Sequence, residues 1–163
     1  MKTQTRTSGV DAAPLGLGSV LVGSLPAALM TEDAPDRYMV EAVFSRRPER
    51  EEVTAILGNE TRDCLTESGY PTVEVTVSDR RLEIANTNLE ELRDGLASVL
   101  ADRLAEISAV VRATREAAAF RFAEAAASEN ERATAVTALA ASVSFRASGN
   151  TQPASASGHE ARR

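Results

Sequence analysis

Alternating apolar and polar residues over residues 70–86 predict a β-hairpin. If Asp79 and Arg80 form a two-residue turn, antiparallel pairing places the Val, Leu and Ile side chains on one face and the charged side chains on the other. A slip of one residue would turn every apolar side chain to the polar face, so the register is strongly specified. The expected opposite pairs are Val75 with Ile84 and Val77 with Leu82.

A strand and a helix are expected before the hairpin. Residues 38–45 alternate, with Val, Ala and Phe on one face, which is typical of a strand. Residues 48–69 carry apolar residues at helical spacing, with acidic residues in the first turn and Gly69 as the stop. Gly58 weakens the middle of this helix by about 1 kcal/mol relative to Ala.

A long amphipathic helix is predicted to begin after the hairpin at Asn88, which forms a capping box with Glu91. A helix that covers three strands needs about four or five turns, which end near residue 107. The apolar stripe nevertheless continues to Phe122. We therefore expect this overhang to be buried against a partner, a second copy of the chain or another protein. The predicted interface residues are Val110, Val111, Ala118 and Phe122.

Composition divides the chain into four segments. Residues 1–36 scatter Gly, Pro, Ser and Thr without a period and are expected to be disordered or processed, whereas residues 37–112 form an α+β domain. The Ala-rich residues 113–146 are expected to form a helical extension, and residues 147–163 a disordered tail. A second capping pattern leaves two alternatives for residues 128–145, which either continue the helix or fold back as a helical hairpin.

The uncharged stretch Leu15–Met30 follows Lys2 and Arg6 and resembles the apolar part of a secretory signal. Glycines and Pro26 interrupt it, and it is too short and Gly-rich to predict a membrane span. We expect a cytoplasmic protein, with secretion as the alternative if residues 1–30 are a signal peptide. A third interpretation starts the chain at Met30, so the presence of residues 1–29 in the mature protein stays open.

The net charge of −6 argues against a protein that tracks nucleic acid, because phosphate affinity comes from clustered positive charge. Nucleic acid is therefore not an expected partner, and neither is a membrane, since the one apolar stretch is too short and Gly-rich to span it. Four arginines still form candidate anion contacts, two after the first strand and two at the hairpin tip. They are Arg46, Arg47, Arg80 and Arg81.

The chain has few residues for histidine- or cysteine-based chemistry. His159 is the only histidine and lies in the predicted tail, and Cys64 is the only cysteine. A Ser/His/Asp or Cys/His arrangement would need that tail residue as its base, and a zinc site needs more ligands of these types. We predict no catalytic residue, no metal and no cofactor.

The sequence thus predicts an α+β fold of β-α-β-β-α order, with a three-stranded sheet, helices on one face and a long Ala-rich C-terminal helical extension. The expected function is that of a non-enzymatic assembly or protein-interaction domain that self-associates through its long helix. The alternative is an accessory subunit of an RNA- or nucleotide-handling enzyme that uses the Arg-bearing hairpin edge. A small ligand-binding enzyme ranks third.

Overall fold

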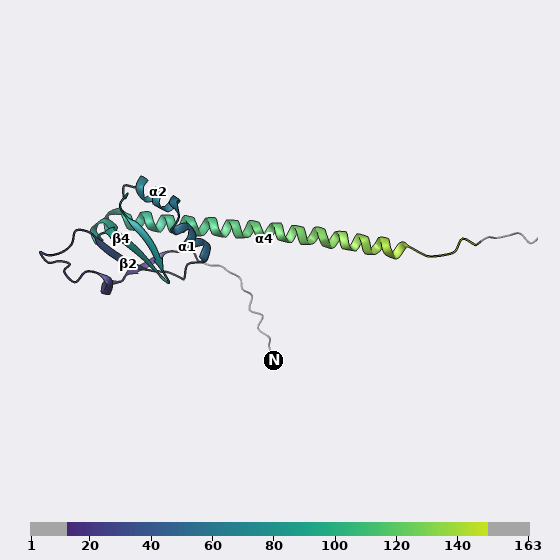
Figure 1. The fold of residues 1–163 in the computed structure, drawn as a ribbon, viewed down its shortest axis with the longest axis horizontal. Coiled ribbons are helices and arrows are strands. Elements are labelled where there is room, and N and C mark those ends of the chain that lie inside the picture. The colour runs from purple at the N-terminus through teal and green to yellow at the C-terminus, as the bar shows by residue number, and fades with distance from the viewer. Residues whose placement is uncertain (1–12, 150–163) are drawn as a thin grey trace, which may run out of the picture. The chain divides into compact units, whose positions relative to one another are not determined.

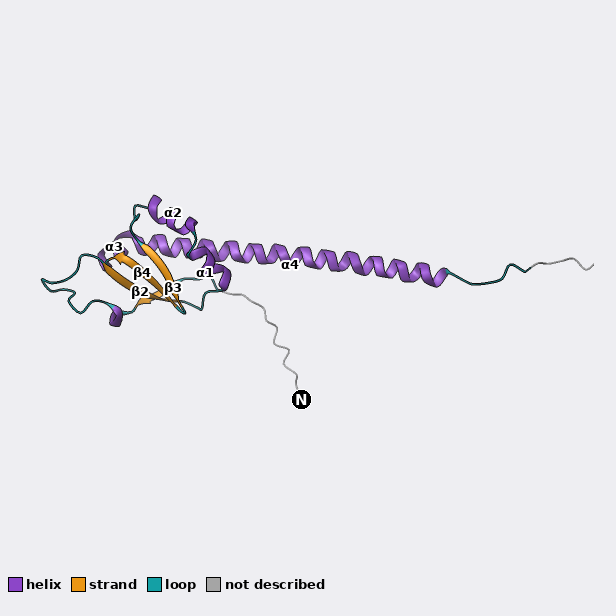
Figure 2. Cartoon of the chain, in the orientation of Figure 1, coloured by secondary structure: helices purple, strands orange, loops and turns teal. Residues whose placement is uncertain are grey.

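The computed structural model describes residues 13–149. It has a mixed α+β fold, with a four-stranded antiparallel sheet and a long helical region that begins at Leu89 (Figures 1 and 2). The chain groups into two compact units whose boundary in the sequence lies between Ala119 and Phe120. The hypotheses of a signal peptide at residues 1–30 and of a disordered tail from residue 147 fall in part outside the described residues.

The strands are arranged in the order β1, β2, β4, β3, and each is antiparallel to its neighbours. The predicted first strand and hairpin correspond to β2, β3 and β4. A short 3₁₀ helix, η1 (Val22–Ser24), follows β1. The strand bounds are β1 Leu17–Val20, β2 Tyr38–Phe44, β3 Glu74–Ser78 and β4 Arg81–Thr87.

The prediction of a three-stranded sheet is wrong by one strand, because β1 lies inside the segment that composition predicts to be disordered or processed. Gly18 interrupts this strand and Gly16 precedes it, so its sequence lacks the alternation that marks the others. It pairs with β2 through Leu17 opposite Phe44 and Val20 opposite Ala42, with an irregular register between them. Leu15, just before β1, is buried in the core. Tertiary anchoring, rather than local pattern, therefore forms this strand.

The hairpin register is confirmed. Val75 lies opposite Ile84 and Val77 lies opposite Leu82. Ser78 pairs with Arg81 across the two-residue turn, where Asp79 adopts a positive φ of 51°. Asp is among the few residues that tolerate this left-handed conformation, which fits a tight hairpin turn.

The helix predicted over residues 48–69 is two helices, α1 (Arg50–Ile56) and α2 (Asn59–Glu67). The break falls at Gly58, which takes an extended conformation in front of α2. The Thr61 hydroxyl donates a hydrogen bond to the Ala55 carbonyl across the break, at 2.9 Å. Gly69 has a φ of 94° after the end of α2, as expected of a C-terminal glycine.

The C-terminal helical region begins at α3 (Leu89–Glu91), continues through a π-helical turn, η2 (Leu92–Leu96), and becomes α4 (Ala97–Ser142). The Asn88 side chain accepts a hydrogen bond from the Glu91 amide at 2.7 Å, which confirms half of the capping box. The Glu91 carboxylate instead accepts from the Thr87 hydroxyl at 3.0 Å. Of the two alternatives for residues 128–145, the structure has continuous helix as far as Ser142.

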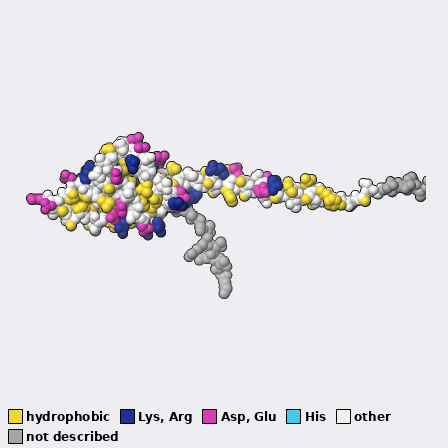
Figure 3. Space-filling model, in the orientation of Figure 1, with side chains coloured by type: hydrophobic (Ala, Val, Ile, Leu, Met, Phe, Trp, Pro, Cys, Tyr) yellow, Lys and Arg dark blue, Asp and Glu magenta, His cyan; other side chains and the backbone are white. Residues whose placement is uncertain are grey.

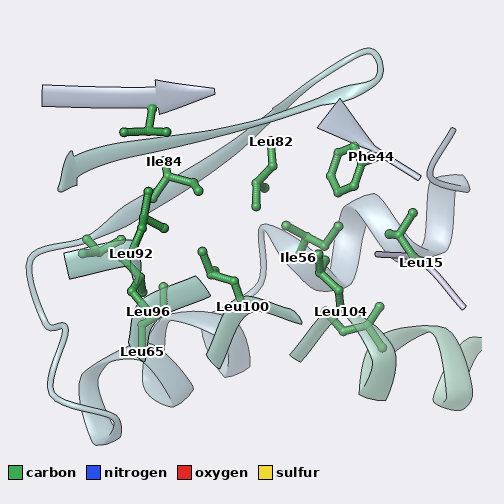
Figure 4. Close-up of a cluster of buried hydrophobic side chains, with 13 residues drawn as sticks. Leu15, Phe44, Ile56, Leu65, Leu82, Ile84, Leu92, Leu96, Leu100 and Leu104 are labelled. Atoms are coloured by element: carbon green, nitrogen blue, oxygen red, sulfur yellow. The ribbon is translucent and has the colours of Figure 1, made fainter. Parts of the chain in front are cut away.

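The core of the first unit lies between one face of the sheet and the helices. Figure 4 shows Leu82 and Phe44 pointing from the strands toward helix side chains such as Ile56 and Leu100. The polar face of β3 and β4 carries Glu74, Thr76 and Glu83, of which Thr76 donates a hydrogen bond to Glu83. Helices on one face and a polar opposite face follow from this alternation.

Candidate functional site

A buried carboxylate, Glu52 of α1, organises the polar end of the core. Its side chain is only 2% exposed. Arg46 binds both carboxylate oxygens, with Nη2 to Oε1 at 2.6 Å and Nη1 to Oε2 at 2.8 Å. The Glu49 amide donates to Oε2 and the Ser108 hydroxyl donates to Oε1, each at 2.8 Å. Each carboxylate oxygen of Glu52 therefore accepts two hydrogen bonds.

This cluster also binds the segment in front of β1. The Leu15 amide donates to the Ser108 hydroxyl oxygen at 2.8 Å, and Arg46 Nε donates to the Ala13 carbonyl at 2.7 Å. One buried ion pair thus links α1, α4 and the chain entering the sheet. We call Arg46, Glu52 and Ser108 the polar clasp.

Two opposing effects set the pKa of Glu52. Burial acts to raise it, because a low-dielectric environment favours the neutral acid. Hydrogen bonds from Arg46, the Glu49 amide and Ser108, together with the Arg46 charge, lower that pKa more strongly. The balance brings the pKa of Glu52 from 4.5 to about 2. The carboxylate is therefore ionised near neutral pH and is a poor proton acceptor, which suits a structural role better than general-base chemistry.

A pocket of about 110 Å³ opens beside the polar clasp. Three arginines and three glutamates line it with Ser108 and Val111, so its formal charges cancel. Arg115 pairs there with both Glu49 and Glu51. This balance gives no preference for an anion or a cation. The charged lining residues are Arg46, Glu49, Glu52, Arg112, Arg115 and Glu116.

The four arginines predicted as anion contacts are only partly brought together. Arg46 is held in the polar clasp by Glu52. Arg47 pairs with Asp79 of the hairpin turn at 3.0 Å. Arg81 pairs with Glu41 at 3.1 Å, and Arg80 is exposed in the turn. Arg47, Arg80 and Arg81 therefore share one end of the hairpin, where two of the three already have acidic partners.

The predicted interface residues lie where the buried part of α4 ends. Ile107 and Ser108 are the last buried residues of α4, and Val111 is half-buried. Val110, Val111 and Ala118 line a shallow apolar hollow of about 350 Å³, together with Glu51, Thr114 and Arg115. Phe122 belongs to the second unit and is 79% exposed. Figure 3 shows apolar side chains at the surface of α4, with charged side chains in small groups between them.

No family model, curated protein or solved structure matches this chain. Among residues 13–149, no helix is both long enough and apolar enough to cross a membrane. In the same part of the chain, no three His, Cys, Asp or Glu side chains are grouped to hold a metal ion.

Proposed function

We propose that the protein is a non-enzymatic assembly or protein-interaction domain that self-associates through the exposed part of α4. The proposal rests on the length of α4 compared with the part of it that is buried. The helix remains regular to Ser142, although its side chains are buried only as far as Ser108. Large apolar side chains lie exposed on the remainder. Within α4 these are Val110, Phe120, Phe122, Val136 and Leu139.

Contact with a second copy stabilises this surface more than contact with water, on two physical grounds. Burying a Phe or Val side chain is worth roughly 1.5–3 kcal/mol, so several such side chains exposed along one helix favour association. Most of the stability of helices in proteins comes from tertiary packing of an amphipathic face, and residues 109–142 have no buried face of this kind within the chain. An isologous dimer satisfies both needs, because the same surface on two copies is covered at once.

Sedimentation equilibrium at micromolar concentration tests the proposal. We expect a dimer that dissociates when Val111→Glu and Phe122→Glu are combined, because both substitutions place charge on the apolar face. Phe120→Glu is the matched control. It is 65% exposed and lies about 160° around the helix from Phe122, so the dimer should persist. A monomeric wild-type protein whose α4 stays fully helical would overturn the proposal.

The alternative proposal, an accessory subunit of an RNA- or nucleotide-handling enzyme, is supported by Arg47, Arg80 and Arg81 at one end of the hairpin. It is weakened by Asp79 and Glu41, which already neutralise two of these arginines. Titration with a single-stranded RNA oligonucleotide tests it. Salt-sensitive binding that is lost in Arg80→Glu with Arg81→Glu would favour this alternative over self-association.

A further inference from the structure

We propose that two copies of α4 pair antiparallel, with Phe122 of each copy at the two-fold axis. This inference rests on the proposed self-association and adds the orientation and register of the pair. The pairing surface is one face of α4, which we call the central stripe. The central stripe consists of Val111, Arg115, Ala118, Phe122, Ala126, Glu129 and Ala133.

The central stripe is defined by helical spacing. Steps of three or four residues bring side chains back to the same face, and the seven positions fall within about 80° of one another around the helix. All of them are exposed except Val111, which is half-buried. Phe122 is its largest side chain, and alanines flank it on the same face, which leaves room for a second Phe122.

Only two members of the central stripe are charged, and their signs are opposite. Arg115 precedes Phe122 by seven residues and Glu129 follows it by seven. In an antiparallel pair centred on Phe122, Arg115 of each copy therefore lies opposite Glu129 of the other. The same register sets Ala118 opposite Ala126 and Val111 opposite Ala133. Charge pairing and central placement of the aromatic ring thus select the same register.

A parallel pair in register would do the opposite. It would place Arg115 against Arg115 and Glu129 against Glu129 on the apolar face, and like charges facing each other there are strongly unfavourable. The charges of the central stripe therefore discriminate between the two orientations. The apolar residues alone do not, since Phe122 faces its own copy in both.

Both charged groups can take up the new contact. Arg115 contacts Glu49 and Glu51 through Nη2, and a guanidinium has five N–H donors in all. Glu129 pairs with Arg132 three residues along its own helix, where both side chains are exposed. Exposed ion pairs of this kind contribute little to stability, so replacing the Glu129 pair with Arg132 by a pair with Arg115 of the second copy costs little free energy.

Distances between spin labels test the orientation. Single cysteines are introduced as Ala135→Cys and, separately, Ala138→Cys, two exposed positions on the side of the helix away from the central stripe, in a Cys64→Ser background that removes the one native thiol. In the antiparallel pair, the distance between identical sites grows by about 3 Å for each residue away from Phe122. We therefore expect axial separations of about 39 Å for residue 135 and about 48 Å for residue 138, to which the spacing between the helices contributes at a right angle.

Each result separates this inference from the proposed function. A dimer with equal, short distances at both sites is parallel, which overturns the inference and leaves self-association standing. Antiparallel distances that extrapolate to a centre more than one turn from Phe122 also overturn it. A monomer by sedimentation, without dipolar coupling between labels, overturns the proposed function itself.

A charge exchange tests the register independently. Glu129→Arg places two positive groups together and should raise the dimer dissociation constant about tenfold or more. Adding Arg115→Glu restores opposite signs and should bring the constant back to within about threefold of wild type. A double variant that dimerises no better than Glu129→Arg contradicts the register. Urea unfolding of each variant checks that the loss of the Arg115 pair with Glu49 leaves the first unit folded.

Discussion

The two stretches of α4 differ in what surrounds them, although they form one continuous helix. In residues 97–108, a Leu/Ile row at helical spacing is buried against the sheet and the short helices. In residues 109–142, alanine dominates and no side chain is buried. Helix formation alone therefore does not distinguish a core element from an exposed one.

The difference lies in how the large side chains are distributed around the helix. Leu100, Leu104 and Ile107 return to the same face, and a single face is enough to form a core. Phe120 and Phe122 are two residues apart and point to nearly opposite sides, so no one surface could cover both. The exposed stretch thus has a continuous but thinner face, more suited to pairing with a similar helix than to a large core.

The largest effect should come from the same truncation made in each stretch. Leu100→Ala removes a side chain that is 3% exposed and should lower the free energy of unfolding by about 3–4 kcal/mol through the cavity it leaves. Leu139→Ala, at a site 70% exposed, should change it by less than about 0.5 kcal/mol. Urea denaturation followed by circular dichroism measures both. Equal losses would mean that the two stretches are packed alike.

The polar clasp marks the end of the buried stretch, and two neighbouring arginines test it. Arg46→Ala leaves the buried Glu52 carboxylate without its cation and should cost about 3 kcal/mol. Arg47→Ala removes an exposed pair with Asp79 and should cost at most about 0.5 kcal/mol. Thermal unfolding of the two variants under identical conditions gives the comparison. A similar melting temperature for both would show that the polar clasp contributes no more than a surface pair.

Acid should weaken the polar clasp specifically. The pKa of Glu52 in the folded protein, about 2, lies below its usual 4.5. The resulting stability is fully present above pH 4.5 and is lost as the pH falls from 4.5 toward 2. Its size is up to about 3 kcal/mol. The difference in unfolding free energy between wild type and Glu52→Gln should therefore narrow over this range. A constant difference down to pH 2 would exclude this linkage.

Local pattern was sufficient for the hairpin and insufficient for β1. The pairing of Val75 with Ile84 follows from local sequence, because the alternation defines the two faces and a two-residue turn fixes the register. The strand Leu17–Val20 depends on Leu15 entering the core and on the Leu15 amide meeting Ser108, which is 93 residues away in sequence. No window of local sequence contains that contact. The sequence predicted that Gly58 weakens the helix over residues 48–69, but not that it separates two helices.

The polar clasp was missed for a related reason. In the sequence, Glu52 is one of several acids that favour a helix N-terminus, and Arg46 is a cation that follows the first predicted strand. A usable signal was present, since Glu52 lies four residues before Ile56 and shares its buried face. An acid on an apolar face predicts a buried partner of opposite charge. The identity of that partner depends on the tertiary fold.

The smallest effect concerns the backbone of the helix itself. Glycine costs about 1 kcal/mol relative to alanine at an exposed helix position. Ala101→Gly lies in the stretch that folds with the sheet, so the whole cost should appear in the free energy of unfolding. Ala135→Gly lies where no side chain is buried, so global unfolding of the first unit should be unchanged while helicity near the substitution falls. Hydrogen exchange at a protein concentration below the dimer dissociation constant resolves the two, since it reports protection amide by amide. If Ala135→Gly lowered the protection of amides in residues 97–108, the two stretches would unfold as one cooperative unit and the contrast between them would fail.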